Sequence, residues 1–270
     1  MNSEQLAHWL ETHLPQIPSL KLAQNRIKVS YVLNWGGFVN HSFTVDDGTR
    51  QYHLKITDDR ESVGKLRLWR EIHHLLELRH QAPKVIDWVD FPGIGFAGLL
   101  MEHINGHTAN FCETPLLVER LISLANRLHR DEEIRTRLET RGARKTCLDH
   151  FIETYIDRFT ADVEALSNDP PGFVSPMLLH WMRQETELLR QTADSEPAFH
   201  RPADQPVHSD LNEGNVLVTP DGFFILDWDD LSLGDPAVDF AVLLWPMIYQ
   251  RPEVVRVFRS RPGRGFLQAN

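Results

Sequence analysis

The spacing of the apolar residues changes once along the chain, and this change restricts the fold more than any other feature of the sequence. Up to about residue 104, short segments alternate apolar and polar residues, as at Val29, Tyr31 and Leu33, and a period of two residues indicates half-buried strands. Beyond this point the apolar residues recur mainly at helical spacing. Strands first and helices later predict an α+β protein with two lobes, residues 1–104 and 105–270.

The first lobe is predicted to contain a short helix, five strands and one long helix. The short helix begins at Ser3 and ends before Pro15, and the long helix covers about residues 58–79. The strands are predicted at about 27–33, 38–45, 51–56, 84–89 and 96–103. In the second lobe we predict helices at about 114–130, 147–166, 175–193 and 236–249, and a strand pair near 215–227.

The composition excludes several classes of protein. The chain has 270 residues with 38 acidic and 28 basic side chains, a formal net charge of −10, whereas a dedicated nucleic-acid binder needs a basic surface. No apolar run approaches the roughly 18 residues of a membrane span, and the N-terminus lacks the basic and apolar regions of a signal peptide. Cys112 and Cys147 are too few for a disulfide framework. We therefore expect a cytoplasmic globular protein that binds neither nucleic acid nor membranes.

Residues 208–227 carry the most informative polar pattern. Two short apolar strands are joined by Pro220-Asp221-Gly222, which predicts a β-hairpin. Asn215 lies just before the first strand and Asp227 just after the second. The hairpin brings both to its open end, where cross-strand neighbours have Cβ atoms about 5 Å apart. An amide oxygen and a carboxylate form a hard, oxygen-only site, which suits Mg²⁺.

Asp210 precedes this pair in a polar loop. A carboxylate beside the metal site, but not needed as a ligand, is placed to accept a proton from an attacking hydroxyl. The alternative is that these residues only cap turns, where Asp and Asn are common. The ordered combination of His-x-Asp-x-x-x-x-Asn at 208–215, a hairpin and Asp227 favours the functional interpretation. For Asp229 and Asp230, assistance to a second metal and exposure to solvent both remain open.

The motifs at 208–215 and Ile225-Leu226-Asp227-Trp228 resemble those of the aminoglycoside phosphotransferase and choline kinase family, relatives of protein kinases. The resemblance covers about residues 30–245. It implies a bilobal protein-kinase-like fold, with an N-terminal lobe of antiparallel sheet and one long helix, a mostly helical C-terminal lobe, and ATP as the phosphate donor. In this pattern Asp210 orients or deprotonates the acceptor, while Asn215 and Asp227 hold Mg²⁺.

The resemblance also implies a nucleotide site in the N-terminal lobe. Lys55 lies on the third predicted strand, on the face opposite its apolar neighbours, and resembles the lysine that positions the nucleotide phosphates. A glutamate of the following helix should hold this lysine. Glu71 resembles that partner, and Glu61 and Glu77 are competitors.

The segment between the first two strands would cover the phosphates. Gly36 and Gly37 allow backbone N–H groups to approach a phosphate closely, and Asn40 adds a donor. An ordinary hairpin turn is the alternative for this segment. By resemblance, backbone groups near Glu102 and Ile104 would pair with the adenine edge.

The acceptor is expected to be a small molecule with a hydroxyl group, such as an aminoglycoside, an amino alcohol or a sugar. Asp149, Glu153 and Asp157 follow one another at four-residue spacing in a predicted helix, and like charges at this spacing destabilise a helix by roughly 0.2–0.5 kcal/mol per pair. A cationic acceptor would offset this repulsion, and a solvated acidic face is the alternative. The sequence thus predicts an ATP-dependent small-molecule kinase. A nucleotide-binding regulator without catalytic activity and a protein-serine kinase are the alternatives.

Overall fold

The protein was analysed as a computed structural model, which describes residues 3–17, 27–32, 40–141 and 145–250. The chain forms two compact units. Of the described residues, the first contains those between 3 and 125, 208–231 and 239–250, and the second contains those between 126 and 207 and 232–238. The hairpin with the polar motifs therefore belongs to the same unit as the N-terminal sheet. None of the helices within the described ranges is both long and apolar enough to span a membrane.

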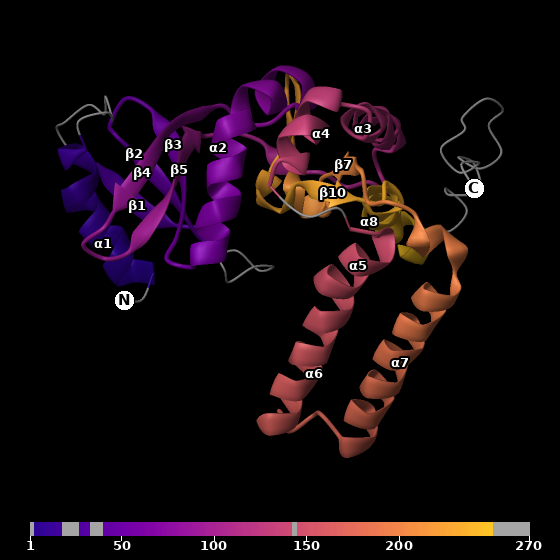
Figure 1. Cartoon of the computed structure of the whole chain (residues 1–270). Helices are drawn as coiled ribbons and strands as arrows, with labels where there is room; N and C mark the ends of the chain where they lie inside the picture. Colours follow the sequence, from indigo (N-terminus) through magenta and orange to yellow (C-terminus); the bar gives the residue numbers. More distant parts are fainter. Residues whose placement is uncertain (1–2, 18–26, 33–39, 142–144, 251–270) are drawn as a thin grey trace. The chain divides into compact units, whose positions relative to one another are not determined.

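The first unit is built on a five-stranded antiparallel sheet (Figure 1). Its strand order is β1 (Lys28–Tyr31), β2 (His41–Asp46), β3 (Gln51–Thr57), β5 (Phe96–Glu102) and β4 (Val85–Phe91). Each of the five predicted strands is present. Their alternating sequences are explained by the two faces of the sheet, which are covered by different helices.

The two faces of the sheet separate Lys55 from its apolar neighbours. Leu54 and Ile56 are fully buried in a core that includes Leu6 and Leu10 of α1 (Ser3–His13). Lys55 points to the opposite face, where its ammonium lies 5.9 Å from the ring centroid of Trp69 in α2 (Arg60–His80). Because successive side chains of a strand alternate between faces, Lys55 lies on the predicted face of the sheet, and its role at the nucleotide phosphates stays a prediction.

Helix α2 has a well-defined beginning and end. The Asp59 side chain accepts a hydrogen bond from the backbone N–H of Ser62 at 2.8 Å, which caps the N-terminus. Gln81 adopts a left-handed conformation at the C-terminus, with φ of 59°. The helix thus matches the predicted range 58–79 to within two residues. Its buried side includes Leu66, Trp69 and Ile72.

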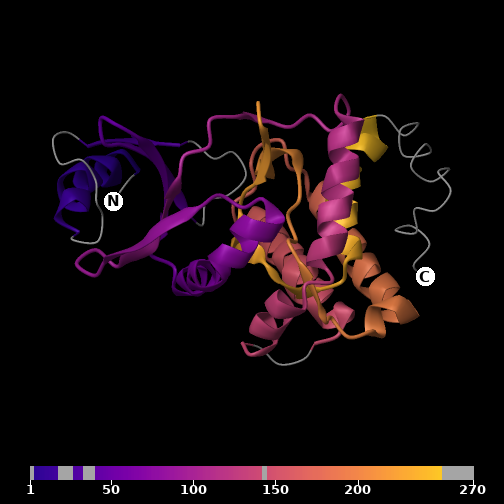
Figure 2. The same cartoon turned by 90° about the horizontal axis from the view of Figure 1, so that it is seen from above.

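The predicted hairpin of residues 215–227 is confirmed. Strands β8 (Val216–Thr219) and β9 (Gly222–Ile225) pair antiparallel, with Val216 opposite Ile225 at the open end. A third strand, β6 (His107–Thr108), pairs with β8. Helices α3 (Pro115–Leu128) and α8 (Ala237–Gln250) lie next to each other in Figures 1 and 2. The thiol of Cys112, just before α3, lies 4.0 Å from the carbonyl oxygen of Pro246 in α8.

The second unit is mostly helical, as predicted. It contains α4 (Glu132–Glu139), α5 (Cys147–Phe151), a π-helical turn (Ile152–Ile156), α6 (Asp157–Asn168) and α7 (Pro176–Ser195), with the short strands β7 (Gln205–Val207) and β10 (Ser232–Gly234). Helices α6 and α7 lie side by side and antiparallel (Figure 1), with Ser167 accepting a hydrogen bond from Arg183 at 2.6 Å. The sequence did not predict α4 or the β7–β10 pair.

Gly98 allows β5 to approach β3 next to Lys55. A Cβ atom at this position would collide with the backbone carbonyl of Lys55 and lie 2.8 Å from Cα of Ile56. Both contacts are with backbone, which cannot rotate away. The close strand spacing behind Lys55 thus requires a glycine here.

We therefore expect Gly98→Ala to lower the free energy of unfolding by about 2–3 kcal/mol, because the strands must separate to admit the methyl group. Urea unfolding followed by circular dichroism measures this loss. Gly93→Ala, in the turn between β4 and β5, is the control, since no atom lies within 4 Å of its Cβ position. Equal stability of the two variants would contradict the steric role of Gly98.

Candidate active site

The loop at residues 208–210 is fixed by a carboxylate from helix α8. Asp239 is fully buried, and its two oxygens accept the backbone N–H groups of His208 at 3.1 Å and Ser209 at 2.8 Å. Ser209 has a left-handed conformation, with φ of 72°, which is uncommon for a residue other than glycine. The bonds to Asp239 hold the chain in this conformation and so set the direction of Asp210.

His208 connects the loop to the hairpin. Its Nε2 lies 2.9 Å from the carbonyl oxygen of Leu226, and its Nδ1 lies 3.3 Å from the backbone nitrogen of Asp210. A neutral imidazole with its proton on Nε2 satisfies both contacts, because Nδ1 then accepts from the Asp210 N–H. The ring also packs edge-on against Trp228, with centroids 4.7 Å apart. His208 is therefore a brace of the loop.

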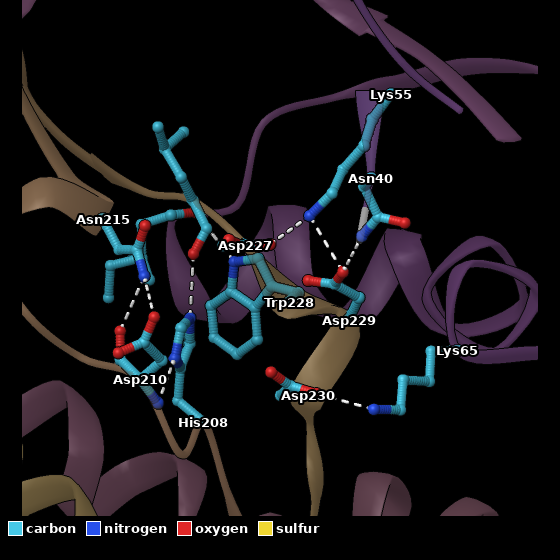
Figure 3. A network of polar contacts seen from close by, with 12 residues as sticks. Asn40, Lys55, Lys65, His208, Asp210, Asn215, Asp227, Trp228, Asp229 and Asp230 are labelled. Atoms are coloured by element: carbon cyan, nitrogen blue, oxygen red, sulfur yellow. Dashed lines mark hydrogen bonds and ion pairs between the residues drawn. The ribbon is translucent and has the colours of Figure 1, made fainter. Parts of the chain in front are cut away.

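Asp210 and Asn215 are joined directly (Figure 3). The Asn215 side-chain amide donates to the backbone oxygen of Asp210 at 2.9 Å and to its carboxylate Oδ2 at 2.7 Å. Asn212 donates to the other carboxylate oxygen, Oδ1, at 2.7 Å. The amide nitrogen of Asn215 is thus used by Asp210, and its amide oxygen is the atom left for a further ligand. Each Asp210 oxygen keeps a lone pair for a substrate proton.

The hairpin brings Asp227 close to this pair, as predicted. The backbone N–H of Leu226 donates to the carbonyl of Asn215 at 2.8 Å, so Asp227 follows one residue beyond the paired end. Its backbone is left-handed, with φ of 63°. The next residue, Trp228, is buried and donates from its indole to the carbonyl of Ile225 at 2.8 Å. This anchor holds the turn that directs the Asp227 side chain.

The ammonium of Lys55 reaches the same turn. It forms ion pairs with Asp227 and, at 2.9 Å, with Asp229 (Figure 3). Asp229 also accepts a hydrogen bond from the side-chain amide of Asn40 at 2.7 Å. Lys55 is only 7% exposed. Residues from β3, from the start of β2 and from the turn after β9 therefore meet at one buried cluster of charges.

The pKa values of the buried carboxylates Asp227 and Asp229 are shifted in opposite directions. Burial raises the pKa of Asp227 to about 7, because desolvation outweighs the attraction of Lys55. Burial alone would also raise the pKa of Asp229, but the Lys55 ammonium holds it well below its ordinary range. Burial alone would lower the pKa of Lys55, and the carboxylates of Asp229 and Asp227 instead raise it. Asp229 is thus the more firmly ionised partner of Lys55.

A model of the phosphotransferase enzyme family matches residues 30–269. The chain belongs to this family. No curated protein sequence is similar enough to match. Among solved structures, the complex of APH(2")-IIia with GDP and kanamycin has a TM-score of 0.66 and 15% identity, covering 94% of this chain and 83% of that one.

Two further solved structures have the same fold. A choline kinase from Cryptosporidium parvum Iowa II has a TM-score of 0.57 and 19% identity, covering 89% of this chain and 68% of that one. A thermostable mutant of the aminoglycoside phosphotransferase APH(4)-Ia, with ADP and hygromycin B, has a TM-score of 0.61 and 17% identity, covering 94% and 83%. The predicted family and kinase-like α+β fold are therefore confirmed, and the chain is a member of a family of phosphotransferase enzymes.

The structure of this phosphotransferase does not bring Glu71 to Lys55. Glu71 lies on an exposed side of α2, and the ion pairs of Lys55 within the described residues are with Asp227 and Asp229. The rotation of α2 about its axis explains why Glu71 does not face Lys55. Trp69 and Ile72, which flank Glu71 in the sequence, are on the buried side of the helix. Asp229, whose role the sequence left open, lies where Glu71 was expected.

The other predicted nucleotide residues lie at three places. Gly36 and Gly37 are outside the described residues. Glu102 ends β5, where its N–H donates to the carbonyl of Lys84 at 2.9 Å and its carboxylate accepts the Lys84 N–H at 2.7 Å. Ile104 follows two residues later and is half-buried. A role for Glu102 and Ile104 in binding adenine stays a prediction.

The donor set fits a magnesium ion. Asn215 offers an amide oxygen and Asp227 a carboxylate, and Mg²⁺ commonly takes one or two such protein ligands and completes its shell with water and phosphate oxygens. No group of three or more His, Cys, Asp or Glu side chains suited to a metal occurs within the described part of the chain. This excludes a dense all-protein metal cage among those residues and is compatible with a two-ligand site.

The acidic stripe of the second unit has internal partners. Asp149 accepts the backbone N–H and the hydroxyl of Thr146, each at 2.8 Å, in a capping box at the start of α5. Glu153 pairs with Lys145, and Asp157 lies 3.5 Å from Arg190 of α7. The predicted repulsion is therefore offset within the protein itself. The stripe gives no reason to expect a cationic acceptor.

We expect Asp239→Ala to lower the free energy of unfolding by about 2–4 kcal/mol, because the buried N–H groups of His208 and Ser209 lose their acceptors. Phosphate transfer should be lost even below the melting temperature, since Asp210 is then no longer held in place. Thermal unfolding and a coupled ATP-consumption assay measure the two effects. Asp221→Ala, in the exposed turn between β8 and β9, should stay within about 0.5 kcal/mol of the natural protein. An active, equally stable Asp239→Ala protein would refute the role of Asp239 in fixing the loop at residues 208–210.

Proposed function

We propose that the protein transfers the γ-phosphate of ATP to a hydroxyl group of a small molecule, with Mg²⁺ as the required metal. The observation that carries this proposal is the hydrogen-bonded pair of Asp210 and Asn215, placed by one hairpin beside the Asp227–Lys55 ion pair. Phosphoryl transfer requires a group for the acceptor proton, ligands for the metal and a cation for the phosphates. These side chains supply all three.

Asp210 is proposed to orient and deprotonate the acceptor hydroxyl. Its carboxylate is fixed by Asn212 and Asn215 at 2.7 Å each, so it needs no reorganisation when the acceptor arrives. A positioned base of this kind contributes about 10²–10⁴-fold to the rate. Asn215 and Asp227 would hold Mg²⁺, which when bound neutralises phosphate charge.

Lys55 is proposed to bind the nucleotide phosphates. The backbone N–H groups of Gly36 and Gly37 and the amide of Asn40 would contact the same phosphates, and backbone groups near Glu102 and Ile104 would pair with adenine. Similar structures support a nucleotide donor, since one contains ADP with spectinomycin and another contains AMP-PNP with hygromycin B. In this reading residues 1–104 are the nucleotide-binding lobe and residues 105–270 the catalytic and substrate lobe.

The acceptor is proposed to be a hydroxylated small molecule such as an aminoglycoside, an amino alcohol or a sugar. Solved structures with the same fold contain kanamycin, spectinomycin or hygromycin B. Because the acids of the α5–α6 stripe are paired internally, neutral sugars belong in the test as much as amines do. An ATP-consumption screen over aminoglycosides, choline-like amines, sugars and nucleosides tests the choice.

We expect Asp210→Asn to reduce phosphate transfer to the acceptor from that screen by about 10²–10⁴-fold. Asparagine keeps the shape of the side chain but cannot take the proton. The dissociation constant for Mg·AMP-PNP, measured by calorimetry, should change by less than about threefold, because Asp210 is no metal ligand in this proposal. Transfer by Asp210→Asn at the natural rate would contradict the assigned mechanism.

The opposite pattern is expected for Asp227→Asn. Loss of the carboxylate should weaken binding of Mg·AMP-PNP by about tenfold or more, a range seen when residues supporting a metal are changed. Binding of AMP-PNP without the metal should change much less. If nucleotide affinity is independent of Mg²⁺ in the natural protein, the proposed metal site is wrong.

A further inference from the structure

Lys55 has two carboxylate partners, Asp227 and Asp229. The proposed function requires one of them, Asp227, as a ligand of the metal. The Lys55 ammonium contacts Asp227 and lies 2.9 Å from Oδ2 of Asp229. A metal ligated by Asp227 would occupy oxygen lone pairs that Lys55 now uses. Because Lys55 is almost completely buried, its ammonium is strongly destabilised without a counter-charge. When Asp227 serves a metal, Asp229 is the carboxylate contact that remains to Lys55 within the described residues, both before and after the phosphates arrive.

Asp229 has the environment for this task. Its side chain is only 10% exposed, and its Oδ2 accepts from Lys55 at 2.9 Å and from the Asn40 amide at 2.7 Å. One donor from strand β3 and one from the residue before β2 converge on this single oxygen. The neighbouring Trp228 is fixed by its hydrogen bond to Ile225. Asp230, the next acid, is 58% exposed and instead pairs with Lys65.

The ion pairs that Lys55 forms within the described residues are with Asp227 and Asp229 and not with a carboxylate of helix α2. The part of the helix that approaches the ammonium is the ring of Trp69, at 5.9 Å, and a ring attracts a cation without neutralising it. The buried indole nitrogen of Trp69 has no hydrogen-bond partner among the described residues. Glu71, which the resemblance favoured for this role over Glu61 and Glu77, lies on an exposed side of the helix.

We propose that Asp229 is the positioning residue for Lys55 and Asn40, in place of a glutamate from helix α2. The proposal rests on the function proposed above, in which Asp227 serves the metal. An ammonium has three N–H donors. Asp229 holds one of them, and the remaining donors of Lys55 are directed to phosphate oxygens. The Asn40 amide is fixed beside them by the same carboxylate.

The test measures binding of Mg·AMP-PNP by calorimetry for Asp229→Asn, Lys55→Met and the double variant. Asp229→Asn should weaken binding about tenfold, and Asp229→Glu should restore part of the loss. In the Lys55→Met background, adding Asp229→Asn should weaken binding clearly less than tenfold, because only the positioning of Asn40 is then left to lose. Asp230→Asn is the matched control in the same turn and should bind as the natural protein does. Circular dichroism confirms that each variant is folded.

Several results would overturn the proposal. Independent, multiplicative effects of Lys55→Met and Asp229→Asn would show that Asp229 does not act through Lys55. A shift in the Mg²⁺ concentration for half-maximal binding, seen with Asp229→Asn but not with Lys55→Met, would make Asp229 a metal ligand instead. A loss with Glu71→Gln equal to that of Asp229→Asn would return the role to helix α2. If the natural protein binds no Mg·AMP-PNP, the proposed function fails as well, whereas natural binding with an unaffected Asp229→Asn variant refutes this inference alone.

Discussion

The buried ammonium of Lys55 is the constraint on which the rest of the first unit depends. A charge in this position is tolerated only because Asp227 and Asp229 lie beside it, and removing one partner of a buried ion pair costs about 3–5 kcal/mol. The carboxylates belong to the turn after β9, and the lysine belongs to β3, so the ion pairs join segments more than 170 residues apart in the chain. Gly98 allows β5 to pack closely against the backbone of Lys55. On the other side of the ion pairs, the hydrogen bond of Trp228 to Ile225 fixes the turn that carries Asp227 and Asp229.

The sequence was sufficient to predict those parts of the site that depend on neighbouring strands. Asn215 and Asp227 flank one hairpin, so pairing of β8 with β9 determines their proximity. The face on which Lys55 lies follows from strand alternation in the same way.

Contacts between distant elements were harder to predict. The partner of Lys55 depends on how α2 is rotated about its axis, and a shift of one or two residues exchanges Glu71 for Trp69 at the inner face. The available signal was Asp227-Trp228-Asp229, where a large apolar residue that is buried stands between two acids that both pair with Lys55.

The acidic residues of α5 and α6 show why charge spacing alone is an uncertain guide to a ligand. The four-residue spacing of Asp149, Glu153 and Asp157 is real, but each acid has a partner that is not on the same helix face. Thr146 lies before the helix, and Arg190 belongs to α7. Neither partner is evident from a helical projection of residues 147–166. The helix α4 and the pair β7–β10 were missed for a related reason, because their short segments are stabilised by contacts with distant parts of the second unit.

The hydrogen bonds from His208 and Ser209 to Asp239 join the loop to a segment that is synthesised after it. The acid lies about thirty residues after the loop it holds, within a helix that carries no other charged side chain. A growing chain that has already formed the sheet, Lys55 and the β8–β9 hairpin still has an unsupported loop at Asp210. Until α8 has been made and has docked, the backbone N–H groups of His208 and Ser209 lack the acceptors that hold the left-handed conformation at Ser209.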